Sequence, residues 1–218
     1  IPLCRKGDRV GIERALASGA AVSEVDAEGN TPLHVAVEAP RNETATVQCL
    51  LENMADPNAV NYIGAAPLHY VCLRKTNWRG IANIILENGA NIDCQTLAGK
   101  SALHFACENQ LPELVEVLCL FGADTNLLDT EANTALHLTL LKEGGRDTVK
   151  QQIIEHLTAS GANCLAPNLR GVTPLHLASG GGYMRSLQLL VQLGADVYAM
   201  TARGETGLHL AARSGFAE

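Results

Sequence analysis

Six of the seven histidines in this 218-residue chain stand in one recurring phrase. Thr31–His34 reads Thr-Pro-Leu-His, and close variants of it end at His69, His104, His137, His176 and His209. Imidazole is both a zinc ligand and an acid–base group near neutral pH, so such a set invites a metal or catalytic hypothesis. The histidines are 33 to 39 residues apart, however, and a period of this size is typical of a stacked-repeat protein.

The spacing argues against a shared metal ion. Zinc needs its donors at about 2 Å from one point, whereas equivalent atoms of neighbouring packed helices lie about 8–10 Å apart. We therefore expect each threonine hydroxyl and histidine ring to hydrogen-bond each other and the backbone of the adjoining turn. Gly180–Gly182 lacks the Lys-Ser or Lys-Thr of a phosphate-binding loop. The sequence predicts no metal, no cofactor and no enzymatic activity.

Each recurring phrase predicts the start of a short helix. Threonine or serine caps a helix N-terminus, and proline is well placed in the first turn. A second helix follows, with apolar residues at helical spacing such as Val47, Leu50 and Leu51. Gly-Ala ends it in most repeats and always precedes the next phrase by 12 residues, with Met54 standing in place of glycine once. Glycine there is typical of a left-handed helix C-cap.

The fixed segment between Gly-Ala and the phrase is too short for another helix. Glycine stands two residues before the phrase in every repeat but one, where Ala132 replaces it. A repeated glycine indicates a turn, so we expect a short extended hairpin. The opposite half of the unit varies in length, and its insertions lie around 39–46, 74–80 and 142–150.

The combined pattern Asp-x-x-Gly-x-Thr-Pro-Leu-His, two helices and Gly-Ala-Asp-x-Asn resembles the ankyrin repeat over essentially the whole chain. The resemblance implies an all-α solenoid of stacked helix-turn-helix units with projecting β-hairpin fingers. It also implies that partners bind the concave face built from the fingertips and the first helices. We expect one array over 1–218, part of a longer protein, with these segments: partial repeat 1–25, repeats 26–59, 60–93, 94–126, 127–165 and 166–198, and partial repeat 199–218.

Composition limits the function classes further. The net charge of −7 argues against general nucleic-acid binding, which needs lysine and arginine to neutralise phosphates. No apolar run reaches the roughly 20 residues of a membrane span, so no membrane insertion is expected. The seven cysteines form no C-x-x-C pair and indicate a reducing compartment, the cytoplasm or alternatively the nucleus. On that reading the Asn-x-Thr pattern at 42–44 is a chance match.

On the concave face that the resemblance implies, some positions are not fixed by the repeat pattern. We expect a protein or peptide partner to contact the side chains at these positions. The candidate partner-binding residues are Tyr62, Ile63, Leu73, Arg74, Leu97, Lys100, Glu108, Glu131, Arg170 and Arg203. Among them Tyr62, Ile63, Leu73 and Leu97 form an apolar cluster, either a contact patch or residues that pack between fingers.

Two hypotheses for the function of the chain remain open. The leading hypothesis is a protein-interaction module of an intracellular scaffold, adaptor or substrate receptor, expected to be monomeric. The alternative is the cytosolic array of a membrane channel or large multidomain effector. In addition, Asn58 and Asn126 resemble the hairpin asparagine that is hydroxylated in this family, and each follows a leucine by eight positions.

Overall fold

A computed structural model describes residues 1–39, 44–74 and 76–216. The chain divides into two compact units, Ile1–Ala102 and Leu103–Glu218. In the described residues there are thirteen α-helices, one 3-10 turn and no β-strand. Each unit is a stack of helix pairs, and each is considered separately below.

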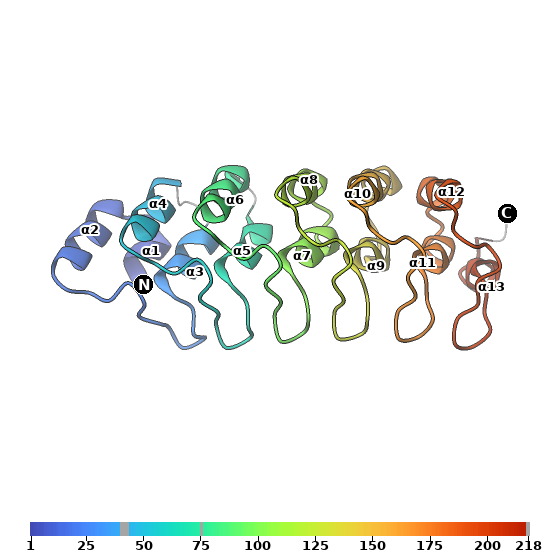
Figure 1. Cartoon of the computed structure of the whole chain (residues 1–218), viewed down its shortest axis with the longest axis horizontal. Coiled ribbons are helices and arrows are strands. Elements are labelled where there is room, and N and C mark those ends of the chain that lie inside the picture. Colours follow the sequence, from blue (N-terminus) through green and yellow to red (C-terminus); the bar gives the residue numbers. More distant parts are fainter. Residues whose placement is uncertain (40–43, 75, 217–218) are drawn as a thin grey trace. The chain divides into compact units, whose positions relative to one another are not determined.

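The first unit contains three helix pairs in two layers (Figure 1). Its elements are α1 (Pro2–Lys6), α2 (Arg9–Ala17), α3 (Pro32–Glu38), α4 (Thr44–Glu52), α5 (Pro67–Tyr70), the 3-10 turn η1 (Val71–Leu73) and α6 (Trp78–Glu87). Helix α3 packs against α1, α4 and α5, and α4 packs against α2 and α6. The inner layer is thus α1, α3 and α5, and the outer layer is α2, α4 and α6.

The second unit repeats this arrangement (Figure 1). Its elements are α7 (Ala102–Glu108), which begins at the boundary residue, α8 (Pro112–Leu120), α9 (Ala135–Leu141), α10 (Asp147–Ala159), α11 (Pro174–Gly180), α12 (Met184–Gln192) and α13 (Gly207–Arg213). Helix α11 packs against α9, α12 and α13, and α10 packs against α8, α9 and α12. The predicted helix pairs are therefore present, and the fold class is confirmed.

The helix boundaries follow the signals read from the sequence. Thr31 and Thr134 accept a hydrogen bond from the backbone N–H of the histidine three residues on, as N-caps do. Gly19, Gly89 and Gly122 follow the second helices with positive φ, the conformation that glycine adopts most readily. Met54 takes the same conformation without being glycine, with φ of 65°.

The segments between helix pairs, which we call fingers, end in turns of five residues. The turns lie at 26–30, 61–65, 96–100, 129–133, 168–172 and 201–205, and in each the first N–H donates to the last carbonyl. The fourth position has positive φ throughout, in Ala132 as well as in the glycines. The expected hairpins are thus compact turns, because one such bond closes each finger and no ladder of strand pairs develops in the described residues.

The core lies between the two layers of each unit. Leu33, Leu50, Ile85, Leu136 and Ile154 are almost fully buried at the positions that the repeat pattern assigns to the helix interfaces. None of the helices in the described part of the chain has the length and apolar character needed to cross a bilayer.

Candidate functional site

The recurring histidines bind backbone groups and stabilise the repeat. In the first unit the N–H of Thr31 donates to Nδ1 of His34 over 3.1 Å, which leaves Nε2 to donate to the carbonyl of Ala65, 2.9 Å away. His69 makes the same pair of bonds, with the N–H of Ala66 and the carbonyl of Lys100. Each histidine therefore ties its own helix N-terminus to the next finger.

The second unit uses the same arrangement. Nε2 of His104, His137 and His176 bonds the carbonyls of Asn133, Val172 and Glu205, respectively. Burial lowers the pKa of His137 and His176, as it does that of His34 and His69, which favours the neutral ring at pH 7. The structural role predicted for these histidines is confirmed by these bonds.

Neighbouring fingers are also joined directly. Within the first unit the N–H of Tyr62 donates to the carbonyl of Glu28, and the N–H of Leu97 donates to that of Ile63 at 3.0 Å. Asn61 Nδ2 donates to Asn30 Oδ1 at 2.7 Å. These bonds hold the fingertips in a row.

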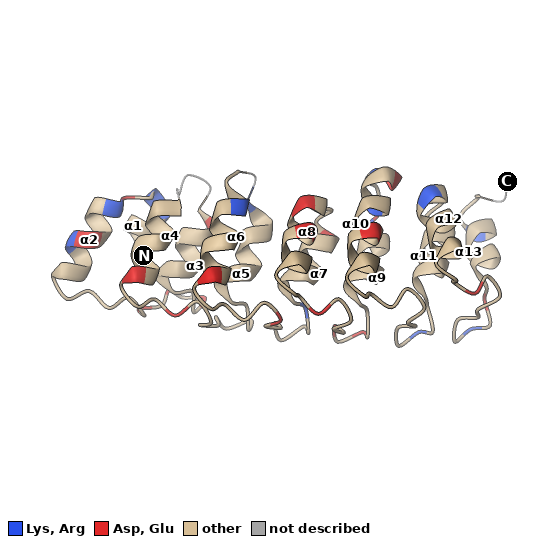
Figure 2. Ribbon diagram, turned by 45° about the horizontal axis from the view of Figure 1, so that its top comes forward, with Lys and Arg blue, Asp and Glu red and all other residues tan. Residues whose placement is uncertain are grey.

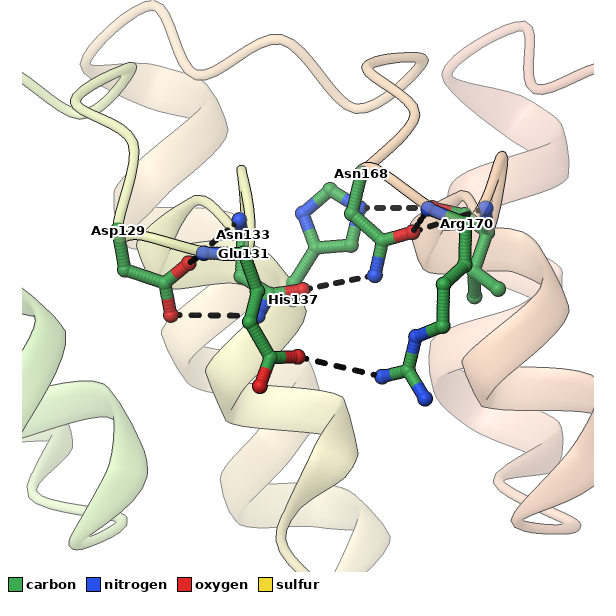
Figure 3. A network of polar contacts seen from close by, with 7 residues as sticks. Asp129, Glu131, Asn133, His137, Asn168 and Arg170 are labelled. Carbon is green, nitrogen blue, oxygen red and sulfur yellow. Dashed lines mark hydrogen bonds and ion pairs between the residues drawn. The ribbon is translucent and has the colours of Figure 1, made fainter.

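In the second unit the same network is visible in Figure 3. Asn168 Nδ2 donates to Asn133 Oδ1 at 2.8 Å, and both side chains are buried. Arg170 reaches Glu131 at 3.4 Å across the fingertips. Exposed pairs of this kind add little to stability, so Glu131 and Arg170 mainly place charge on the face formed by the fingertips and the inner helices. We call this the finger face.

The predicted apolar cluster is exposed in the first unit. Tyr62, Ile63, Leu73 and Leu97 have relative exposures of 69, 59, 56 and 77%, respectively. The Tyr62 ring lies over the preceding fingertip, since a Cβ built on Gly29 would come within 2.7 Å of it. Tyr62 thus touches the neighbouring finger, and all four side chains still present apolar surface to solvent.

Arg74 does not belong to this exposed surface. Its side chain is buried, and its guanidinium donates to the carbonyls of Val37 and Ala39 at 2.7 and 2.6 Å. These carbonyls lie at the C-terminus of α3, where the helix leaves backbone acceptors without an internal partner. The predicted placement of Arg74 on the partner-binding surface is wrong, because this requirement of the preceding repeat draws the side chain inward.

The other predicted residues divide by their exposure. Lys100 and Glu108 are half-buried, and the Lys100 carbonyl accepts the bond from His69. Glu131, Arg170 and Arg203 are exposed, all three on the fingertips of the second unit. The structure therefore brings Tyr62, Ile63 and Leu97 together in one unit and Glu131, Arg170 and Arg203 in the other.

A groove opens on the finger face of the second unit. It has a volume of about 370 Å³ and is lined by Leu169, Arg170, Val172, Thr201, Ala202, Arg203, Glu205, Leu210 and Arg213. Arg213 of α13 forms an ion pair with Glu205 at its edge. Arg170 and Arg203 are among the predicted partner-binding residues, and the apolar floor combines residues of two fingers and a helix.

The first turn of α10 holds a structural cluster that the sequence analysis missed. Asp147 accepts from the backbone N–H of Arg185 and Ser186, at 2.7 and 3.1 Å, and from the Ser186 hydroxyl. It therefore caps α12 from the neighbouring helix pair. Lys150 is fully buried and donates to two backbone carbonyls near the end of α9. Departure from the regular repeat length was the only sequence signal for these contacts.

The two candidate hydroxylation sites bridge consecutive repeats in the same way. Asn58 Nδ2 donates to the Gly89 carbonyl at 3.0 Å, and Asn126 Nδ2 donates to that of Gly161 over the same distance. Asn58 Oδ1 accepts from the backbone N–H of Asn91, and Asn126 Oδ1 accepts from that of Asn163. These N–H groups lie two residues after Gly89 and Gly161, respectively. Both side chains are exposed.

The cysteines are free thiols throughout the described residues. Cys72 and Cys107 are buried, and burial raises the pKa of Cys72 to about 12, so both pack as small apolar groups. No group of three or more potential metal ligands gathers anywhere in the described residues. Residues 42 and 43 of the Asn-x-Thr pattern lie outside the described residues.

Comparison with known proteins agrees with this architecture. A family model for three copies of the ankyrin repeat matches residues 3–96 and 141–218. A second model, for many copies of the repeat, matches residues 85–138. The chain belongs to the ankyrin-repeat family. No curated protein matches it.

Three solved structures illustrate the similarity. The ankyrin repeat domain of human ASB11 is 24% identical with a TM-score of 0.80, and the match covers 96% of this chain and 90% of that one. An ankyrin repeat domain from Acinetobacter baumannii AYE is 28% identical with a TM-score of 0.79, over 89% of this chain and 96% of that one. The ankyrin repeat domain of Bcl-3, a member of the IkappaB family, is 24% identical with a TM-score of 0.80, over 96% of this chain and 91% of that one.

Proposed function

We propose that this chain is a non-catalytic module that binds a partner protein or peptide on its finger face. The observation that carries the proposal is the exposure of four apolar side chains in the first unit, Tyr62, Ile63, Leu73 and Leu97, of which Ile63 and Leu97 lie on fingers joined by a backbone hydrogen bond. Large contiguous apolar patches are uncommon on surfaces that stay in contact with water and often mark interaction sites. Aromatic residues in particular are enriched among the side chains that contribute most to binding.

The rigidity of the fingertips supports the same proposal. Tyr62 and Leu97 are each fixed by a backbone hydrogen bond to the preceding finger. A surface that is already ordered loses little conformational entropy when a partner binds. Membership of the ankyrin-repeat family agrees, because ankyrin repeats are generally protein-interaction modules.

The wider role that we propose is that of a monomeric interaction module in an intracellular scaffold, adaptor or substrate receptor. The seven free thiols favour a reducing compartment, the cytoplasm or the nucleus.

The test compares proteins captured by the immobilised wild-type chain with those captured by a Tyr62→Ala, Ile63→Ala, Leu97→Ala variant. Quantitative mass spectrometry should show at least one protein that is enriched by the wild type and lost with the variant. A matched control is Met54→Ala, Leu120→Ala, which removes apolar side chains that are 86 and 79% exposed, just after α4 and at the last residue of α8. Equal capture by all three proteins would contradict the proposal.

A further inference from the structure

The groove of the second unit combines basic side chains with an apolar floor. Arg170 and Arg203 occupy the third position of consecutive fingertip turns, and Arg213 comes from α13. Between residues 165 and 216 the chain has four arginines and only two acidic residues, although its net charge is −7. Basic residues accordingly mark the fingers before α11 and α13 (Figure 2).

The three arginines differ in their partners. Arg170 pairs with Glu131, and Arg213 pairs with Glu205. Arg203 is exposed, and no carboxylate pairs with it in the described residues. Its guanidinium is therefore available to an anionic group, for which its planar donors are well suited.

The floor between these charges is apolar and held in place. Leu169 is 73% exposed, and Val172, Ala202 and Leu210 line the groove beside it. The two fingers approach so closely that a Cβ on Gly171 would lie 2.7 Å from the Ala202 nitrogen. That nitrogen donates to the Arg170 carbonyl at 3.0 Å, so the groove is already formed without a ligand.

A second cleft adjoins this groove within the same unit. The groove's volume of about 370 Å³ is within the range of about 300–1,000 Å³ found for ligand sites. The second cleft, of about 240 Å³, shares Leu210 and Arg213 with the groove and continues along the ends of α9 and α11 past Leu141 and Tyr183. The two clefts together form a trough open at the surface, which suits a peptide chain.

We propose that this trough binds an extended peptide of a partner protein that carries a carboxylate next to an apolar side chain. The carboxylate pairs with Arg203, and the apolar side chain lies on Leu169, Ala202 and Leu210. A nucleic acid is the less suitable occupant, because carboxylates already compensate Arg170 and Arg213 and the chain is acidic overall. This inference rests on the proposed function and assigns the partner's chemistry on the finger face of the second unit.

The test is a selection from a displayed library of random peptides about nine residues long. The enriched sequences should contain an acidic residue within two positions of a leucine, isoleucine or methionine. Binding of the best synthetic peptide, measured by fluorescence polarisation, should weaken at least about tenfold with Arg203→Glu. Arg185→Glu makes the same charge change at an exposed residue of α12 outside the groove and should alter binding by less than about twofold.

Several outcomes would overturn the inference. One is enrichment of peptides without acidic residues, and another is equal binding to the Arg203→Glu variant while both proteins unfold at the same temperature. Tight binding of a single-stranded oligothymidine at the same groove would also overturn it, as would a selection that enriches nothing. Peptides that lose binding only with the Tyr62→Ala, Ile63→Ala, Leu97→Ala variant would overturn this inference and leave the proposed function standing.

Discussion

The buried amine of Lys150 should make the free energy of unfolding depend on pH. Its side chain is 0% exposed, and Nζ donates to the carbonyls of Thr139 and Lys142, each at 2.8 Å. Nζ also lies 4.4 Å from the centre of the Tyr183 ring. Burial lowers the pKa of Lys150 from 10.5 to about 8, because the charged form has lost its water. The charge of Asp147 raises this pKa and that of Lys142 lowers it, but the loss of water is the largest cause.

The pKa difference gives the sign and size of the effect. Between pH 8 and 10.5 the unfolded chain binds more protons at Lys150 than the folded chain does, so stability rises with pH in that window. Each pKa unit corresponds to about 1.4 kcal/mol, and the charge therefore costs the folded state roughly 3 kcal/mol below pH 8. From about pH 7 to about pH 9.5 the group should add about 2 kcal/mol to the free energy of unfolding.

The assay is urea denaturation of the wild type and of Lys150→Met at both pH values. The difference in unfolding free energy between the two proteins should change by about 2 kcal/mol in favour of the wild type as the pH rises. Cys72, whose pKa burial raises, acts in the opposite direction but is present in both proteins. At pH 7 the difference in unfolding free energy also includes the loss of a hydrogen-bond donor to two carbonyls. The quantity to compare is therefore the change of this difference with pH.

A control separates burial from charge alone. Lys6 is exposed, and Lys6→Met serves as the control for the removal of a lysine from the protein surface. If Lys150→Met shows a constant difference, the amine is not desolvated in the folded protein and the reasoning is refuted.

Three further predictions concern single side chains. Asp147→Ala should lower the free energy of unfolding by about 1–2 kcal/mol in urea titration, because α12 loses its cap. Exposed Thr148→Ala on the same helix should change it little. Ala66→Thr should raise the free energy of unfolding by about 1 kcal/mol, since α5 is the one inner helix with alanine at the N-cap position where four others have threonine. Ala66→Val, which adds similar bulk without a hydroxyl, should not. Mass spectrometry of the chain isolated from cells should find one added oxygen on the peptides containing Asn58 and Asn126.

Each of these has a clear contrary result. Equal stability of Asp147→Ala and Thr148→Ala would mean that the carboxylate does not cap α12. Equal effects of threonine and valine at position 66 would mean that packing, not the cap hydroxyl, governs this site. Unmodified peptides at both Asn58 and Asn126 would remove the hydroxylation hypothesis.

Much of the fold follows from short-range pattern. The threonine caps, the glycines after the second helices and the apolar spacing are local signals, and the helices that they predicted are present. The role of the histidines could also be predicted, because the same geometric need recurs in every repeat. Repetition made these inferences possible, since one unit was read several times.

Tertiary structure decided the features that occur only once. Arg74 donates a hydrogen bond to the carbonyl of Val37 at the end of α3, and the two residues are 37 positions apart in the sequence. Asp147 caps α12 by accepting from the N–H of Arg185, which is 38 positions away. No local rule selects these partners, because each depends on which carbonyl or N–H group the packed neighbour leaves unsatisfied. The sequence by itself determined the repeating unit and the surface that its pattern leaves free. Only the packed chain determined which charged side chains stay on that surface and which are drawn inward to complete hydrogen bonds of the backbone.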